Sequence, residues 1–188
     1  DKIRAGDEIV RARYRRMTRL AIEAQGVLGE VVARADVGFS PGQTFYTTSL
    51  RPLWKNVLQA AASLEYVHGE TWYLSLTGFG LAVFRVPQSE RVLLLEPESV
   101  DPGRRHTALF YGGAATGRRR FEDADVVAQA SAIYTSSRDL VTQLQLSYDG
   151  IEPPQIKAGM ALIAGERGGI GDLFDGNDFA FLAYRAVW

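Results

Sequence analysis

The sequence predicts an α+β fold, with a mostly antiparallel sheet of about five to seven strands and two helices packed on one face. Three observations lead to this expectation. The first third of the chain has apolar residues at helical spacing, the middle and the end carry clusters of β-forming residues, and these clusters follow one another without regular intervening helices. Strands that cluster in this way favour antiparallel pairing over a parallel α/β arrangement.

The long N-terminal helix is expected within residues 7–35. Its apolar residues recur in alternating steps of four and three, which places them on one stripe of a helix. Gly26 and Gly29 each weaken a helix by about 1 kcal/mol relative to alanine. An alternative interpretation makes 17–25 and 27–37 the two strands of a hairpin around Gly26. The stripe consists of Val10, Tyr14, Met17, Ala21, Ala24, Leu28, Val31 and Ala35.

A second helix is predicted over residues 49–67, after a turn at 40–42 and a short strand at 43–47. Thr48 or Ser49 can cap its first turn, where Pro52 is tolerated, and Gly69 ends it. The residues expected on its buried face are Leu50, Leu53, Trp54, Val57, Leu58, Ala61 and Leu64.

The remaining predicted strands all lie after residue 70. A hairpin is expected around Thr77-Gly78, and a run of aliphatic residues after residue 90 predicts a strand buried on both faces. Residues 121–147 are ambiguous: helices are predicted there, but 130–135 and 140–147 also contain enough β-forming residues to be strands. The strands expected elsewhere are 71–76, 79–86, 90–95, 106–111, 155–164 and 178–187.

Composition limits the classes of function. The 188 residues fit one globular domain, residues 1–188, and the absence of cysteine excludes disulfides and thiol catalysis. A net charge of −1 provides no long-range field for nucleic acid, so no nucleic-acid partner is expected. No run approaches the roughly 20 apolar residues of a spanning helix, so the sequence predicts a soluble domain without a membrane span.

The most basic segment is the candidate anion-binding site. Arg118, Arg119 and Arg120 follow one another in a stretch expected to be a loop, and guanidinium groups suit phosphate or carboxylate ligands. The glycine-rich segment 165–172 lacks the lysine and hydroxyl of a phosphate-binding loop, and it predicts a hairpin loop. The acidic residues of segment 172–178 are interpreted as turn formers, so neither a metal nor a cofactor is expected.

One set of short motifs resembles the ADP-ribosyltransferase family. The segment 45–50 is similar to that family's aromatic-x-Ser-Thr-Ser strand motif, with Thr48 and Ser49 at the two last hydroxyl positions. Arg4 resembles the family's first-strand arginine, and Glu90 the glutamate of its Gln/Glu-x-Glu motif. The resemblance implies that the arginine and hydroxyls hold NAD, while the glutamate stabilises an oxocarbenium-like ribose.

The functional expectation is a non-catalytic ligand-binding, sensory or protein-interaction domain. A long amphipathic helix leading into a second helix and a sheet resembles extracytoplasmic sensor domains, whose ligand is a small molecule or a protein. The stripe within residues 7–25 would also allow a homodimer through the N-terminal helix. Two alternatives stay open: the NAD-dependent transferase, with Arg4, Thr48, Ser49 and Glu90 as its site, and a structural subunit of a larger assembly.

Overall fold

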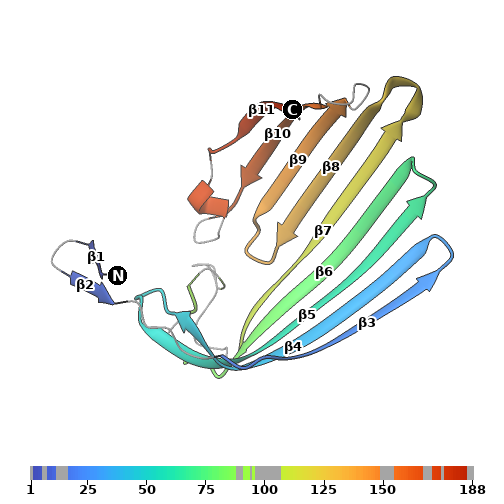
Figure 1. Cartoon of the computed structure of the whole chain (residues 1–188). Coiled ribbons are helices and arrows are strands. Elements are labelled where there is room, and N and C mark those ends of the chain that lie inside the picture. The colour runs from blue at the N-terminus through green and yellow to red at the C-terminus, as the bar shows by residue number, and fades with distance from the viewer. Residues whose placement is uncertain are drawn as a thin grey trace.

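A single curved antiparallel sheet dominates the computed structural model of the chain (Figure 1). Nine strands lie in strict sequence order from β3 to β11, and each pairs with its chain neighbour. Two short strands near the N-terminus, β1 (Lys2–Ala5) and β2 (Glu8–Arg11), form a separate two-stranded sheet. The structure describes residues 2–5, 8–11, 17–87, 91–93, 95, 107–148, 155–166, 171–174 and 176–185.

The strands of the large sheet are long, and six of the nine have ten or more residues. Apart from one register shift between β4 and β5, neighbouring strands stay in continuous register, and each of the seven inner strands is hydrogen-bonded to a strand on both sides. The nine strands are β3 (Leu20–Leu28), β4 (Val31–Tyr46), β5 (Pro52–His68), β6 (Trp72–Phe84), β7 (Thr107–Phe121), β8 (Val126–Thr135), β9 (Leu140–Tyr148), β10 (Gln155–Ala164) and β11 (Phe179–Arg185).

The predicted α+β class is wrong, because the interpretable part of the chain is all-β. Its helical content is limited to two 3₁₀ turns, η2 (Glu122–Ala124) and η3 (Gly171–Phe174). None of the described residues belongs to a helix that is long and apolar enough to cross a membrane. The sheet also exceeds the predicted number of strands, since both predicted helices became strands.

The N-terminal helix expected within 7–35 is replaced by strands, which removes the basis for dimerisation through such a helix. The described segments of this range form β2, β3 and the start of β4. Gly29, with φ of 59°, begins a two-residue turn that brings Leu28 opposite Val31. Nine successive pairs between β3 and β4 then satisfy the backbone. The alternative hairpin interpretation was right in kind, although its turn lies at Gly29 instead of Gly26.

The second predicted helix is also a strand, β5, and it is the longest in the sheet. Its apolar residues satisfy helical and strand periodicity together because leucine and alanine occupy positions on both faces. Pairing decides between the two. The segment is hydrogen-bonded to β4 on one side and β6 on the other, and this tertiary ladder overrides the local helical preference.

Of the elements predicted after residue 70, some are confirmed and some are wrong. Thr77-Gly78 lies inside β6 and does not form a turn, so two predicted strands are one. The helices favoured for 121–147 are β8 and β9, as the strand alternative proposed. The strand predicted over 155–164 is confirmed by β10, and β11 confirms the final one over Phe179–Arg185, within the described residues. Only part of the range 90–95 lies within the described residues, where Val92 makes an isolated bridge to Thr47.

A small buried cluster lies at one end of β5, β6 and β7. Val57, Val83 and Ala108 face one another across the three strands, and Val92 completes their cover. A register shift between Ser40 and Gln43 bends β4 beside this cluster. The cluster is on one side of the sheet only, so the packed core occupies a fraction of the sheet area.

Asp139 connects the turn between β8 and β9 with η3. Its Oδ1 accepts a hydrogen bond of 3.0 Å from the backbone N–H of Gly171, and its Oδ2 accepts one of 3.2 Å from the hydroxyl of Thr135. The carboxylate is buried, and these donors compensate for its desolvation. This contact therefore joins η3, which precedes β11, to the turn between β8 and β9. That turn lies at the same end of the sheet as the buried cluster.

Candidate functional site

The large sheet presents two chemically different faces. We call one of them the apolar face. It carries the odd-numbered side chains of β7 and of Val31–Phe39 in β4. In the other strands, β3, β5, β6, β8, β9, β10 and β11, it carries the even-numbered side chains. The polar face carries the alternate side chains. Lys, Arg, Asp and Glu occur at one strand position of the apolar face, Arg119, whereas the polar face carries most of the charged and amide side chains.

The apolar face is the more exposed of the two. Leu64 of β5 and Leu76 of β6 expose 54% and 61% of their surface, while the side chain of Glu65, the next residue of β5 and on the polar face, exposes 18%. Exposure alternates in this sense along most of β5, β6 and β10. A sheet built for water has the opposite arrangement, with its apolar side chains turned to the core. In this sheet the apolar side chains are therefore the more exposed ones and the polar side chains the more enclosed ones, the reverse of a sheet in a water-soluble protein.

The total surface is also larger than a compact chain requires. The protein exposes 13644 Å², whereas a compact monomer of this length would expose about 8,900 Å². Large apolar patches of this kind mark surfaces that are covered by another apolar phase or partner.

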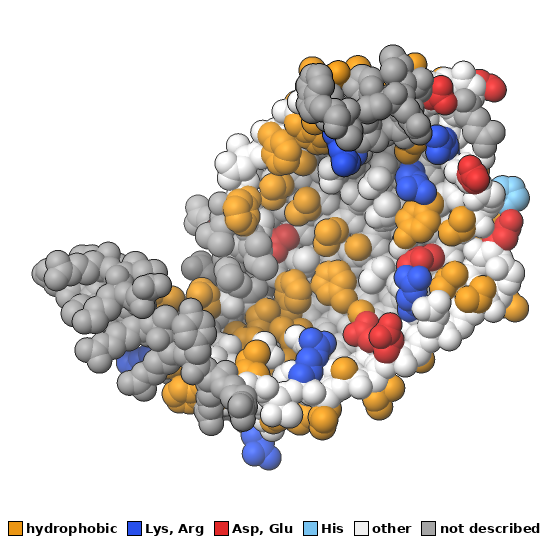
Figure 2. Space-filling model, in the orientation of Figure 1, with side chains coloured by type: hydrophobic (Ala, Val, Ile, Leu, Met, Phe, Trp, Pro, Cys, Tyr) orange, Lys and Arg blue, Asp and Glu red, His pale blue; other side chains and the backbone are white. Residues whose placement is uncertain are grey.

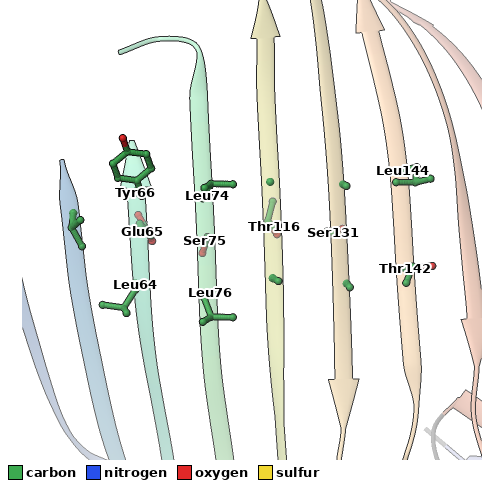
Figure 3. A pocket seen from close by; sticks show the side chains of 15 residues that line it. Leu64, Glu65, Tyr66, Leu74, Ser75, Leu76, Thr116, Ser131, Thr142 and Leu144 are labelled. Carbon is green, nitrogen blue, oxygen red and sulfur yellow. The ribbon is translucent and has the colours of Figure 1, made fainter. Parts of the chain in front are cut away.

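A shallow groove runs over the middle of the apolar face. Its volume is about 830 Å³, and small residues of β7 and β8 form its floor, between leucines of β5, β6 and β9. Figure 3 shows Leu64, Leu74, Leu76 and Leu144 on the near side of the sheet, with Glu65, Ser75 and Thr116 behind the strands. The floor consists of Ala115, Gly117, Ala130 and Ala132.

Aromatic side chains gather near both ends of the apolar face. At one end, Phe121, Tyr148 and Tyr184 lie in a single register row across β7–β11. At the other end, Tyr111 of β7 and Tyr134 of β8 are more than half exposed. The length of strand β7 from Tyr111 to Phe121 is about 34 Å, at roughly 3.4 Å per residue. Between these two groups of aromatic residues the face consists mainly of aliphatic residues and glycine, together with Thr142 and Tyr66, which line the groove.

A polar contact joins the turn between β3 and β4 to the end of β5 that carries Tyr66 and His68. The Nδ1 atom of His68 lies 2.8 Å from Oε1 of Glu30. This contact holds the pKa of Glu30 below its ordinary value, and a hydrogen bond from the Tyr66 hydroxyl acts in the same direction. The same hydrogen bond raises the pKa of Tyr66. The ring of Tyr66 therefore lies on the apolar face while its hydroxyl reaches a charged group at the strand end.

The polar face carries paired charges. Arg34 donates a hydrogen bond of 2.6 Å to Glu65 and a second, of 3.3 Å, to the amide oxygen of Gln25. Arg118 lies on the same face, with its guanidinium carbon 5.7 Å from the ring centre of Tyr73. Figure 2 shows acidic and basic side chains beside one another on the hollowed side of the sheet. This part of the polar face is suited to contact with water, whereas the buried cluster of Val57, Val83 and Ala108 covers the same face at one end of the strands.

The three arginines predicted as an anion-binding group belong to strand β7, not to a loop. Because side chains alternate along a strand, Arg118 and Arg120 lie on the polar face and Arg119 on the apolar face. The structure therefore does not bring the three guanidinium groups together.

The residues suggested by the transferase resemblance are not assembled into a site by the described residues. Thr48 and Ser49 follow β4, and the hydroxyl of Ser49 lies 2.8 Å from that of buried Thr47. The backbone of Arg4 belongs to β1, which is part of the separate small sheet. Glu90 lies outside the described residues.

The described residues offer no grouping of three or more His, Asp or Glu side chains that could hold a metal ion. Asp178, one of the acids interpreted as turn formers, accepts a hydrogen bond of 2.8 Å from the backbone N–H of Ile163. This contact joins the residue before β11 to strand β10, fifteen residues away in the sequence, so it is a contact between strands and not a local turn.

The apolar face was missed by reasoning from the sequence, although a signal for it exists. The run Leu74-Ser75-Leu76-Thr77 alternates with a period of two, as does most of 140–148. Comparison with known proteins adds no family assignment: no protein-family model matches the chain, and neither the curated proteins nor the solved structures contain a significant match.

Proposed function

We propose that the chain is a membrane-embedded sheet whose apolar face contacts the acyl chains of a lipid bilayer and whose polar face contacts water. The observation that carries this proposal is the inverted exposure, in which leucines of β5 and β6 lie outward while the charged and hydroxyl side chains between them are more enclosed. In water this arrangement would leave a large apolar area hydrated, at a cost that grows with the area.

The dimensions of the apolar face support the same conclusion. Strands that cross a bilayer need about 9–11 residues and carry aromatic residues at both interfaces. The distance of about 34 Å between the two borders of β7 becomes about 24–28 Å across the membrane for a strand tilted by 35–45°. This range matches an apolar band of about 25 Å.

The proposal keeps the non-catalytic, ligand-binding class that the sequence suggested, with lipid as the ligand. It replaces the expectation of no membrane span, because that expectation applied the length of a helix and strands cross in fewer residues. No contact among the described residues favours the transferase alternative, and a role as a structural subunit is compatible with a sheet embedded in lipid.

A cysteine scan along β6 tests the proposal. The natural chain has no cysteine, so Leu74, Ser75, Leu76 and Thr77 can each be replaced by a single reactive thiol. We expect a charged, water-soluble thiol reagent to modify positions 75 and 77 in lipid vesicles at least about ten times faster than positions 74 and 76. The reason is that the ionised reagent does not enter hydrocarbon.

Lipid contact is separated from protein contact by a second measurement on the same four variants. A fluorophore attached to each thiol should be quenched by nitroxide-labelled acyl chains at positions 74 and 76 and much less at 75 and 77. If positions 74 and 76 were shielded from the reagent but also from the nitroxide, a protein surface would cover the face. Equal reactivity at all four positions would refute the proposal.

A further expectation concerns the two edges of the sheet. Among the described strands, β3 pairs only with β4 and β11 only with β10. An unpaired backbone edge is costly in hydrocarbon, so both outer edges must be hydrogen-bonded in the bilayer. Amide exchange in vesicles should therefore be slow at the outward N–H groups of β3 and β11. Exchange there as fast as in an unstructured peptide would argue against burial of these edges in lipid.

A further inference from the structure

Arg119 is the one strand position of the apolar face with a formally charged Lys, Arg, Asp or Glu side chain in the described strands. It lies near the aromatic border of β7 and pairs with Trp72 of β6. Its guanidinium carbon is 4.8 Å from the ring centre of Trp72 and 4.7 Å from that of Phe121. Two rings therefore hold the guanidinium by its π-face, and such contacts leave its N–H edge able to bind an anion.

A second apolar groove begins beside this arginine. It has a volume of about 690 Å³ and is lined by Trp72 and Arg119 together with Leu146 and Met160 of the next strands. It shares Gly117, Ala130 and Leu144 with the groove of about 830 Å³ described above. The two grooves therefore form one apolar depression that leads from the guanidinium toward the middle of the face.

We propose that this depression is a binding site for an anionic phospholipid, with the phosphate on Arg119 and an acyl chain along the groove. The proposal rests on the bilayer location proposed above and adds a specific lipid site to it. A guanidinium fork matches the geometry of a phosphate, and the two rings restrict its motion before the lipid arrives. The small residues Gly117 and Ala130 leave room for a chain that larger side chains would fill.

The chemistry favours a phospholipid over a free anion. Arg118 also belongs to the lining of this groove, but strand alternation directs its side chain to the polar face, where its guanidinium carbon lies 5.7 Å from the ring centre of Tyr73. Arg119 therefore provides the single positive charge on the apolar face at this border, beside the apolar groove. A lipid uses both features, because its headgroup meets the charge and its chain meets the groove. A water-soluble phosphate uses only the first.

Two adjacent arginines of β7 allow a matched test. Arg119→Gln removes the charge from the apolar face, and Arg118→Gln removes the same charge from the polar face of the same strand. Both are made in the full chain with Trp54 and Trp188 replaced by phenylalanine, so that Trp72 alone reports. The probe is phosphatidylglycerol or phosphatidylcholine with brominated acyl chains, diluted into phosphatidylcholine vesicles, and the readout is quenching of Trp72.

We expect the chain that keeps both arginines to bind phosphatidylglycerol about five times more tightly than phosphatidylcholine, as for one basic group at a membrane surface. Arg119→Gln should reduce this preference to near one, while Arg118→Gln should preserve it. Ala130→Phe, which fills the groove but keeps Arg119, should weaken binding of phosphatidylglycerol severalfold. Glycerol phosphate in large excess should not displace the lipid.

Each other outcome contradicts a defined part of the proposal. Equal effects of Arg119→Gln and Arg118→Gln would overturn the headgroup site, and no effect of Ala130→Phe would overturn the acyl-chain groove. Displacement by glycerol phosphate would assign the site to free phosphate esters. These failures are distinct from failure of the proposed function, since the cysteine scan of β6 reports lipid contact independently of lipid selectivity.

Discussion

Replacing Leu76 by arginine is expected to lower the free energy of unfolding in a bilayer by about 2–4 kcal/mol. Leu76 lies on the apolar face of β6, opposite Ala115 of β7 and midway between the aromatic borders. At this depth the guanidinium would be surrounded by hydrocarbon and far from both interfaces. Urea unfolding of the chain in thin phospholipid vesicles, followed by tryptophan fluorescence, measures the change.

Ser75→Arg is the matched control, because it introduces the same side chain one residue away on the polar face. Its side chain would enter the water-facing side of the sheet, and we expect a loss well below that of Leu76→Arg. Equal losses for the two variants would contradict the assignment of the faces. A loss at Leu76 that depends on protein concentration would indicate that a second copy, rather than lipid, covers the apolar face.

Substitution of Gly112 by alanine is expected to destabilise the sheet by about 1–3 kcal/mol. A Cβ at this position would lie 2.5 Å from the carbonyl oxygen of Tyr134 and 2.7 Å from Cζ of Phe79. The phenyl ring can move, but the carbonyl belongs to strand β8, which pairs with β7 at this point. The added methyl group therefore displaces backbone, and the loss appears in the same urea titration.

Gly113→Ala provides the comparison for this variant. The nearest atom to its added Cβ is the carbonyl oxygen of Thr77 at 3.5 Å, an ordinary contact distance. Alanine also restricts the unfolded chain more than glycine does, so the stability should remain unchanged or rise slightly. Destabilisation of both variants to the same extent would show that the strand requires glycine for a reason other than the approach of β8.

Much of the β-structure was accessible from the sequence. The prediction of a mostly antiparallel sheet and of the strands at 155–164 and 178–187 rested on β-forming residues bounded by turn residues, and the structure confirms both strands. The helical predictions failed where apolar residues lie at both helical and strand spacing, as in 49–67. In such segments the deciding energy is the hydrogen bonding to neighbouring strands, which are distant in the sequence.

The candidate site was accessible only in part. The sequence identified the arginine cluster 118–120 as unusual, but assignment to a loop hid the alternation that separates Arg119 from its two neighbours. Nothing local indicates that Trp72 pairs with Arg119, because the two residues are joined through the register of β6 and β7. The sequence therefore shows the positive charge of Arg119, whereas its contact with Trp72 depends on the pairing of β6 with β7.

The sequence by itself determined that some strands have two unlike sides, because a period of two in Leu74-Ser75-Leu76-Thr77 separates apolar from polar side chains. It also determined that these 188 residues contain no cysteine, and therefore no thiol or disulfide chemistry of their own. Only the tertiary structure decided which side is exposed. Alternation is the same for a sheet that encloses its apolar side and for one that encloses its polar side. The direction in which nine paired strands curve distinguishes them.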